Sequence, residues 1–286
     1  MPDYSIWTIQ YASAVGHPVG SMLYGHHNAG VLAIPYCYHV VQGADDLLVI
    51  DTGYSDDPHS QELGKLAGVV SWADPATCFG RIGLRPEDVD VVVITHAHFD
   101  HMGNLAAFPN AHVYLQEREL AKALSAFSLP HRLAWMTAAM NADDLDAVVR
   151  LVLAGRVTLL DGRLEDLLPG ISLVPAFDSH TQGSQYVVVE NGDDGRWVVP
   201  GDVIGMRANL RGVDGDGRYV PIGFASGSQR KVLAVMDDIM QAVGGDVTRV
   251  LAPHDPELWS EPRARRFDDD LYIAEMTLRE GAVSRL

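Results

Sequence analysis

Short apolar runs that end at turn or polar residues recur along the chain. Each run is rich in Val, Leu or Ile, and runs of this length and composition are typical of strands buried in a sheet. We predict such strands at residues 47–50, 89–94, 157–160, 186–189, 196–199 and 248–252.

Two pairs of runs are separated by residues that favour a tight reversal of the chain. Between residues 186–190 and 196–199 the sequence reads Asn-Gly-Asp-Asp-Gly, and Asn-Gly is a strong hairpin signal. A shorter turn at residues 43–45 separates residues 33–41 from 46–51. We therefore predict two antiparallel hairpins.

Helical periodicity fills the segments between the runs. Residues 116–127 begin a helical stretch that Pro130 interrupts, and residues 133–140 and 145–153 continue it after a capping turn at Asn141. Another helix is predicted at residues 229–243, with Ser226 or Ser228 as the N-cap and two glycines as its end. Residues 267–278 fit a mixed or helical segment.

The resulting order is strands, helices, strands and helices, without a repeat, a low-complexity tract or a Pro/Ser-rich linker. We predict one domain over residues 1–286 of the α/β or α+β class, in which both faces of the sheets are covered. Residues 116–153 form a helical insert in this prediction, and its apolar surface is a candidate contact in a homodimer.

The amino-acid composition argues against some classes of binding partner. The chain of 286 residues has 38 acidic and 21 basic residues, a formal net charge of −17, and such a surface repels phosphate backbones. No run reaches the roughly 20 apolar residues of a membrane span, and the N-terminus lacks the pattern of a signal peptide. We expect a cytoplasmic protein without nucleic-acid or membrane partners. Cys37 and Cys78 have neither a disulfide framework nor metal-type spacing.

The most informative segment follows the apolar run at residues 91–94. It brings His96, His98, Asp100 and His101 within six residues at the end of a strand. His96 and His98 are two positions apart, so in an extended segment they point the same way. Imidazole nitrogen and carboxylate oxygen suit zinc or a similar divalent ion, and this spacing allows two adjacent ions. A single buried histidine could be inert, but four such residues in this order indicate a metal site.

At these residues the sequence resembles the metallo-β-lactamase superfamily, whose signature is His-x-His-x-Asp-His. Four further elements occur in the order of that family: Asp51-Thr-Gly53, His180-Thr-Gln-Gly183-Ser, Gly201-Asp202 and the final His254. The resemblance implies a four-layer αβ/βα sandwich, with two mixed β-sheets flanked by helices.

The resemblance also implies a set of seven ligands for two divalent metal ions. His96, His98 and His180 would bind the first ion, Asp100, His101 and His254 the second, and Asp202 both. Taken alone, His180, Asp202 and His254 could each be ordinary turn or loop residues. Asp51 precedes the site and would orient a ligand. Zinc is the expected metal, although iron, manganese and cobalt accept the same ligands.

With two ions in place, the family's chemistry is hydrolysis by a metal-bridging hydroxide, and Asp100 would orient the nucleophile and protonate the departing group. An aspartate at position 202 resembles the binuclear hydrolases of this family, which include lactonases, glyoxalase II-type thioesterases and nucleases. The long segment before the motif, its His-x-His-Phe-Asp-His form and the helical insert resemble the N-acyl-homoserine lactonases used in quorum quenching, and their pyridoxolactone-hydrolysing relatives. We therefore predict an enzyme that opens a small-molecule lactone. The alternative is another small ester, thioester or cyclic amide hydrolysed at the same site. A metal-binding module without catalysis and a diiron redox protein stay open, although 286 residues leave little room for a flavodoxin-like domain.

One position departs from the lactonase pattern. Quorum-quenching lactonases carry a tyrosine three positions after the bridging aspartate, where this chain has Gly205. Candidates for substrate contacts are therefore Tyr219, Met22 in a possible apolar lip and His27 near a pocket mouth, although packing or a surface position explains each as well. The remaining histidines, His17 among them, carry no spacing signal.

Overall fold

The computed structural model describes residues 1–286, and its largest element is a nine-stranded sheet. The order is β12-β13-β1-β2-β3-β5-β6-β7, and β4 pairs with β1. Strands β3, β5, β6 and β7 are parallel, whereas the other pairs are antiparallel. The strands are β1 (Ser5–Pro18), β2 (Val31–Gln42), β3 (Leu47–Ile50), β4 (Val69–Trp72), β5 (Val91–Val93), β6 (His112–Gln116), β7 (Val157–Leu160), β12 (Ala264–Arg266) and β13 (Tyr272–Thr277).

A second sheet of four strands has the order β11-β10-β9-β8. It contains β8 (Leu164–Leu168), β9 (Ile171–Pro175), β10 (Gln185–Glu190) and β11 (Arg196–Val199), all paired antiparallel. Its parallel component is a single bridge between Val198 and Val250.

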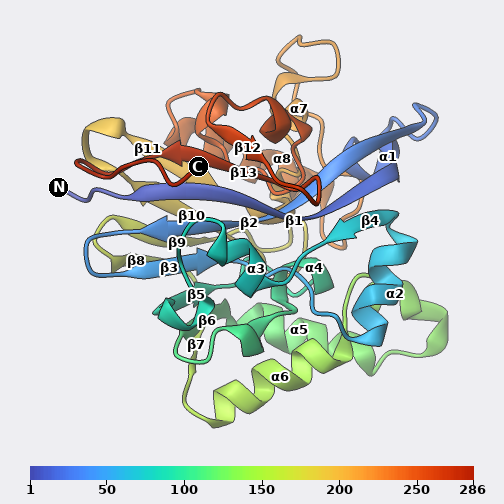
Figure 1. The fold of residues 1–286 in the computed structure, drawn as a ribbon. Coiled ribbons are helices and arrows are strands. Elements are labelled where there is room, and N and C mark those ends of the chain that lie inside the picture. The colour runs from blue at the N-terminus through green and yellow to red at the C-terminus, as the bar shows by residue number, and fades with distance from the viewer.

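Eight α-helices flank the sheets, and Figure 1 shows α2, α5 and α6 on one side of the molecule and α7 and α8 on the other. None of them is long and apolar enough to cross a bilayer. The helices are α1 (Val19–Met22), α2 (Pro58–Leu66), α3 (Pro75–Gly80), α4 (Phe99–Met102), α5 (Glu117–Phe127), α6 (Ala142–Leu153), α7 (Ala208–Arg211) and α8 (Gln229–Ala242).

Three buried clusters correspond to the spaces between four layers. Leu48 and Ile50 of β3 meet Val187 and Val189 of β10 between the two sheets. Another cluster fills the opposite face of the large sheet, where helices such as α3, α5 and α6 pack on it. The third lies between the small sheet and α8. The predicted two sheets flanked by helices are therefore confirmed.

Most of the predicted elements are confirmed. Both hairpins form: β2 pairs with β3, and β10 with β11. The helices at α5, α6 and α8 begin and end within a few residues of their predicted bounds, and Asn141 caps α6 by accepting a hydrogen bond from the Asp143 N–H at 3.0 Å.

Three predictions about elements were wrong. Residues 248–252 form a 3-10 turn (Val247–Arg249) and one bridge instead of a strand. Residues 267–278 contain β13, because their apolar side chains pack on β1 in the large sheet. Residues 133–140 include a 3-10 helix, His131–Thr137, instead of an α-helix. The long strand β1 was not predicted from the sequence.

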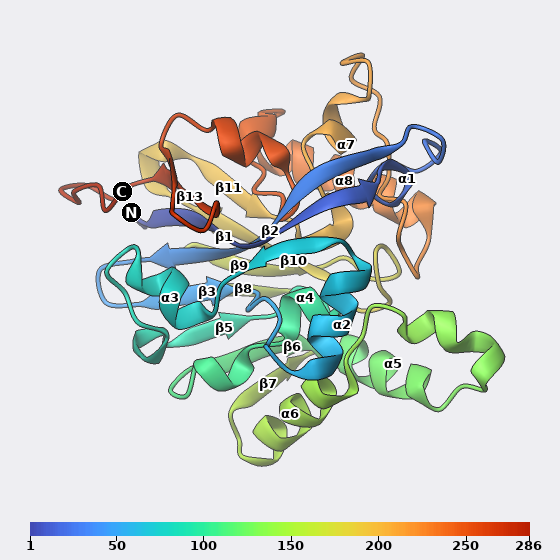
Figure 2. The same ribbon diagram turned by 45° about the vertical axis from the view of Figure 1, so that its right-hand side comes forward.

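The helical segment from α5 to α6 extends beyond the sheets in Figure 2. Its exposed apolar side chains include Leu124, Phe127 and Trp135. A homodimer contact at this segment stays a prediction.

A buried carboxylate lies under this segment. Asp144 of α6 is 5% exposed, and its Oδ2 atom has no hydrogen-bond partner. Burial, with smaller contributions from Asp57 and Asp143, raises the pKa of Asp144 to about 7. The folded chain therefore holds this proton more tightly than the unfolded chain does.

We expect Asp144→Asn to change how stability depends on pH. The stability that comes from protonated Asp144 is complete below its unfolded pKa near 4 and is lost as the pH rises through about 7. Urea unfolding at pH 8 should show the variant more stable than the wild type by about 1–3 kcal/mol, with a much smaller difference at pH 5. Asp146→Asn, at an exposed position of the same helix, is the control. An equal difference at both pH values would show that Asp144 is ionised throughout.

Candidate metal centre

The seven predicted ligands lie together at one edge of the sandwich. His96, His98, Asp100 and His101 follow β5, and His180 lies in the loop between β9 and β10. Asp202 follows β11, and His254 follows the segment that bridges to that strand. The two sheets are joined at this edge, because Gln185 at the start of β10 donates from its N–H to the Thr95 carbonyl at 2.9 Å and from Nε2 to the Ile94 carbonyl at 2.8 Å.

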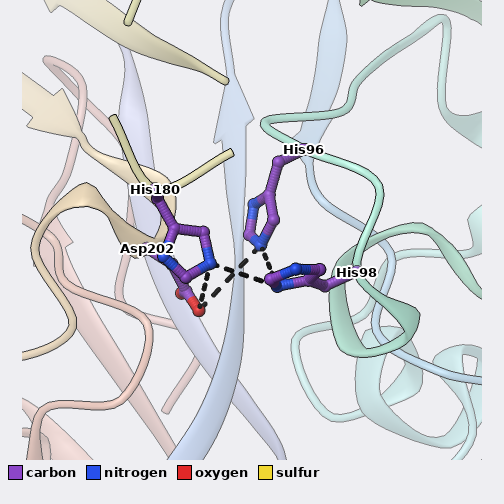
Figure 3. Close-up of side chains that lie close together, drawn as sticks. All are labelled: His96, His98, His180 and Asp202. Atoms are coloured by element: carbon purple, nitrogen blue, oxygen red, sulfur yellow. Dashed lines mark hydrogen bonds and ion pairs between the residues drawn. The ribbon is translucent and has the colours of Figure 1, made fainter. Parts of the chain in front are cut away.

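One group of four donors consists of His96, His98, His180 and Asp202 (Figure 3). Nδ1 of His98 is 3.0 Å from Nε2 of His96 and 3.1 Å from Nε2 of His180. Oδ2 of Asp202 is 3.5 Å from Nε2 of His180 and 3.9 Å from Nε2 of His96. All four residues are buried, and their donor atoms face a common point.

The second group consists of Asp100, His101 and His254. Oδ2 of Asp100 is 3.5 Å from Nε2 of His101 and 3.7 Å from Nε2 of His254. The other oxygen of Asp202, Oδ1, is 3.2 Å from each of the same two nitrogens. The carboxylate of Asp202 therefore reaches one group with each oxygen.

These distances fit divalent ions. Two ligand atoms 2.0–2.1 Å from a tetrahedral zinc ion lie about 3.3 Å apart, close to the separations here. Nε2 of His101 and Oδ1 of Asp202 are buried and have no hydrogen-bond partner, so two polar atoms are directed at the space that an ion would fill. The two groups of buried donors support two divalent metal ions per chain.

The charges around the site favour a cation bound between neutral imidazole rings. Burial is the largest influence that lowers the pKa of His98 to about 4 and that of His180 to about 3. Both rings are therefore neutral at pH 7, which is the form that binds metals. For His101 the carboxylates of Asp202, Asp100 and Asp51 overcome burial and raise the pKa well above its ordinary value. The position of His101 thus attracts a cation.

Asp51 holds two of the histidines, as the sequence predicts for an orienting residue. Its Oδ2 accepts a hydrogen bond from Nδ1 of His101 at 2.7 Å, which leaves Nε2 of that ring free for an ion. The same oxygen accepts from the Thr95 hydroxyl at 2.8 Å, and that hydroxyl lies 3.0 Å from Nδ1 of His96. Asp51 has a φ of 63°, a backbone conformation that aspartate tolerates better than most residues.

A second supporting carboxylate, Glu119 of α5, was not predicted from the sequence. It is 1% exposed, and its Oε1 accepts from the N–H of Ala97, between His96 and His98, at 2.8 Å. Its Oε2 accepts from the Thr181 hydroxyl at 2.7 Å and the Gly183 N–H at 2.8 Å, both just after His180. A Cβ at Gly183 would lie 2.2 Å from the Glu119 backbone nitrogen, so glycine is required for this close approach. Glu119 therefore ties together the two loops that carry three of the histidines.

Next to the ligands is a cavity of about 220 Å³. His98, Asp100, Asp202 and His254 line it on the side of the metal-ligand groups. Most of the other lining residues are apolar: Met22, Leu63, Leu66, Ala67, Phe99, Ala138, Ala139, Ile222 and Phe224. Such a space suits a small organic molecule with one polar end.

Of the three candidates for substrate contacts, only Met22 lines this cavity. Tyr219 packs against the cluster under α8, and His27 packs against Tyr24. At Gly205 a Cβ would already be 3.2 Å from Cδ1 of Ile222 and 3.3 Å from Sδ of Met22. These two apolar side chains occupy the space beside Gly205.

The sequence did not reveal a basic surface, but the structure contains one. Arg263, Arg265, Arg266 and Arg279 line an open cleft of about 900 Å³ near the C-terminal strands. None of the residues that line it also lines the cavity beside the metal-ligand groups. The basic residues are thus gathered away from the candidate centre.

Comparison with known proteins places these observations in a family context. A model of the metallo-beta-lactamase superfamily matches residues 33–273. A probable metallo-hydrolase of Mycobacterium tuberculosis is 28% identical over 256 residues, with 82% of this chain and 77% of the relative covered. The N-acyl homoserine lactonase AiiB of Agrobacterium fabrum is 26% identical over 170 residues, 54% of this chain and 57% of the lactonase. The structure of AidC, a dizinc quorum-quenching lactonase, has a TM-score of 0.65 at 14% identity and covers 96% of both chains.

We expect Glu119→Gln to weaken the centre without removing any of the seven donors. The amide has only one oxygen, so its NH₂ group must face at least one of the donors that Glu119 now accepts from. The free energy of unfolding should fall by about 1–3 kcal/mol, and the affinity for metal by about 10- to 100-fold. Urea unfolding and metal titration of the apoprotein measure the two effects. Glu117→Gln, at an exposed position of the same helix, is the matched control, and equal behaviour of the two variants would contradict the role of Glu119.

Proposed function

The chain belongs to the metallo-beta-lactamase superfamily and is a metal-dependent hydrolase, and from this premise we propose that it opens the ring of a small lactone. The observation that carries the proposal is the cavity, because it joins donors from both ligand groups to a small apolar space. The similarity to the AiiB lactonase supports the same substrate class.

In this proposal each group of ligands would hold one ion, and Asp202 would contribute to both groups. His96, His98 and His180 form the first group, and Asp100, His101 and His254 the second. Zinc fits this set of nitrogen and oxygen donors best, and AidC is a dizinc relative of the same fold. Two such ions supply Lewis acidity, which polarises an ester carbonyl and makes water nucleophilic near neutral pH.

The residues of the chain contribute positioning and proton transfer. Asp100 lines the cavity and accepts the proton of the attacking water at a carboxylate oxygen. As the bond between the acyl carbon and the ring oxygen breaks, Asp100 returns this proton to the ring oxygen, and the product is a hydroxy acid. Leu63, Ile222 and Phe224 exclude bulk water from the reacting groups.

The structure also suggests how Asp100 is kept in place. Its backbone carbonyl accepts a hydrogen bond from the hydroxyl of Tyr11 at 2.7 Å, and Tyr11 is buried in the large sheet. The start of α4 is thereby fixed to β1. Since the side chain of Asp100 must serve both an ion and the leaving group, a rigid backbone here favours the reaction.

Metal removal and a substrate panel test this proposal. We expect about two equivalents of divalent metal per chain by elemental analysis, turnover of γ- and δ-lactones, loss of activity with a chelator and recovery when zinc is added back. Faster turnover of linear esters, thioesters or lactams would establish the alternative substrate class. Unchanged lactone turnover by protein that has been shown to be metal-free would refute the mechanism.

An accompanying variant isolates Asp100. Asp100→Asn should lower kcat by about 100-fold or more, because the amide cannot carry the proton. Asp237→Asn, at an exposed position of α8, should leave kcat and metal content unchanged. An Asp100→Asn enzyme that retains both its metal and its kcat would exclude Asp100 as the proton carrier.

A further inference from the structure

Three polar side chains line the cavity without belonging to either metal-ligand group: His17, Ser21 and Tyr36. The hydroxyl of Ser21 has no hydrogen left to donate to a ligand, because it donates to the Pro18 carbonyl at 2.7 Å. His17 and Tyr36 come from the paired strands β1 and β2, and Nε2 of His17 is buried without a hydrogen-bond partner. The proposed mechanism uses neither residue.

Tyr36 is buried beside the second ligand group. It is 3% exposed, and its ring packs edge-on against His254 with 4.7 Å between the ring centroids. Its hydroxyl makes no hydrogen bond within the chain, whereas the neighbouring Tyr11 donates to the carbonyl of Asp100. The hydroxyl is not among the fully buried unpaired atoms, and Tyr36 lines the cavity, so a ligand in the cavity can accept its hydrogen bond.

His17 provides an acceptor in the same cavity. Its Nδ1 lies 3.4 Å from the carbonyl oxygen of Ala67, and a carbonyl can only accept, so Nδ1 carries the hydrogen. In a neutral imidazole the other nitrogen, Nε2, is then an acceptor. This Nε2 atom is buried and has no hydrogen-bond partner.

We propose that Tyr36 and His17 form a pair that positions the substrate. The hydroxyl of Tyr36 donates a hydrogen bond to an oxygen of the ester, and Nε2 of His17 accepts one from an O–H or N–H on the substrate. The inference rests on the proposed function and narrows its substrate class to small lactones that carry a hydrogen-bond donor close to the ester. No covalent step is assigned to either residue.

The other walls of the cavity do not offer a comparable hydrogen bond to the substrate, so we assign it to residues of β1 and β2. The loop after Asp202 offers only Gly205, where Met22 and Ile222 occupy the adjacent space. Around α2 and residues 138–139 the lining is apolar. A bound ester must satisfy its polar atoms, and outside the two ligand groups Tyr36 offers an unused donor and Nε2 of His17 a buried unused acceptor.

Tyr36→Phe tests the donor, and Tyr38→Phe is its matched control. Tyr38 is two residues further along β2, is 1% exposed, and its hydroxyl also lacks a partner. It stacks on Tyr11 and Phe79 and does not line the cavity. In the zinc-loaded enzyme, Tyr36→Phe should lower kcat/KM for lactones by about 10- to 100-fold, whereas Tyr38→Phe stays within about twofold.

A measurement of binding accompanies the kinetics. Affinity for the lactam analogue of a lactone substrate, measured by calorimetry on the metal-loaded proteins, should fall by about tenfold or more in Tyr36→Phe only. Metal content and the free energy of unfolding should be alike in Tyr36→Phe and Tyr38→Phe. A purely structural role of Tyr36 would lower its stability and leave affinity unchanged.

His17→Phe tests the acceptor with two substrates, γ-butyrolactone and its α-hydroxy derivative. The wild type should prefer the hydroxylated lactone, and the variant should reduce the ratio of the two kcat/KM values by about tenfold. An unchanged ratio would overturn the role of His17.

The result for Tyr36 separates this inference from the proposed function. If the wild type opens lactones and Tyr36→Phe behaves like Tyr38→Phe, the inference is wrong and the proposed function stands. If the wild type opens no lactone, both the inference and the proposed function are wrong.

Discussion

The carboxylate of Asp202 lies between the ligands that come from the two sheets. It is buried at the end of β11 in the small sheet, and its two oxygens face imidazoles from both sheets. A buried carboxylate is costly unless positive charge lies next to it. Burial alone would raise the pKa of Asp202, yet His101 and His254 hold it well below its ordinary value. This buried carboxylate thus needs positive charge next to it, which divalent ions would supply.

Contacts with residues outside the ligand set hold the donor atoms of the ligands in their orientation. Asp51 fixes the ring of His101 and, through Thr95, that of His96, whereas Glu119 joins the backbone around Ala97 to the loop of His180. The final histidine has its own support, because Nδ1 of His254 lies 3.0 Å from the Pro35 carbonyl. The next residue, Asp255, pairs with the buried Arg207, which also reaches Glu261 at 2.6 Å. Each ligand loop is therefore restrained by a polar contact, and metal affinity depends on these contacts as well as on the ligands.

The cavity beside the ligands is mostly apolar. Apolar side chains from α2, from residues 138–139 before α6 and from the loop before α8 form much of its apolar wall. Gly205 has no side chain, but the space beside it is filled by Met22 and Ile222. Most of these apolar wall segments are far from the metal motif in sequence, and only Phe99 comes from within it.

The sequence by itself predicted the cluster of metal-binding residues and most of the local elements, and its resemblance to a known family predicted the layers. Local signals decide these features: the spacing of His96, His98, Asp100 and His101, the apolar runs of β3, β5 and β10, and the turn residues between β10 and β11 are all short-range patterns. Only the tertiary structure decided which other residues serve the centre. Glu119 contacts Ala97 and Gly183 across 22 and 64 positions, and His254 contacts Pro35 across 219. A lone glutamate, tyrosine or histidine carries no spacing signal, and its function arises from burial and from the partners that the fold brings to it.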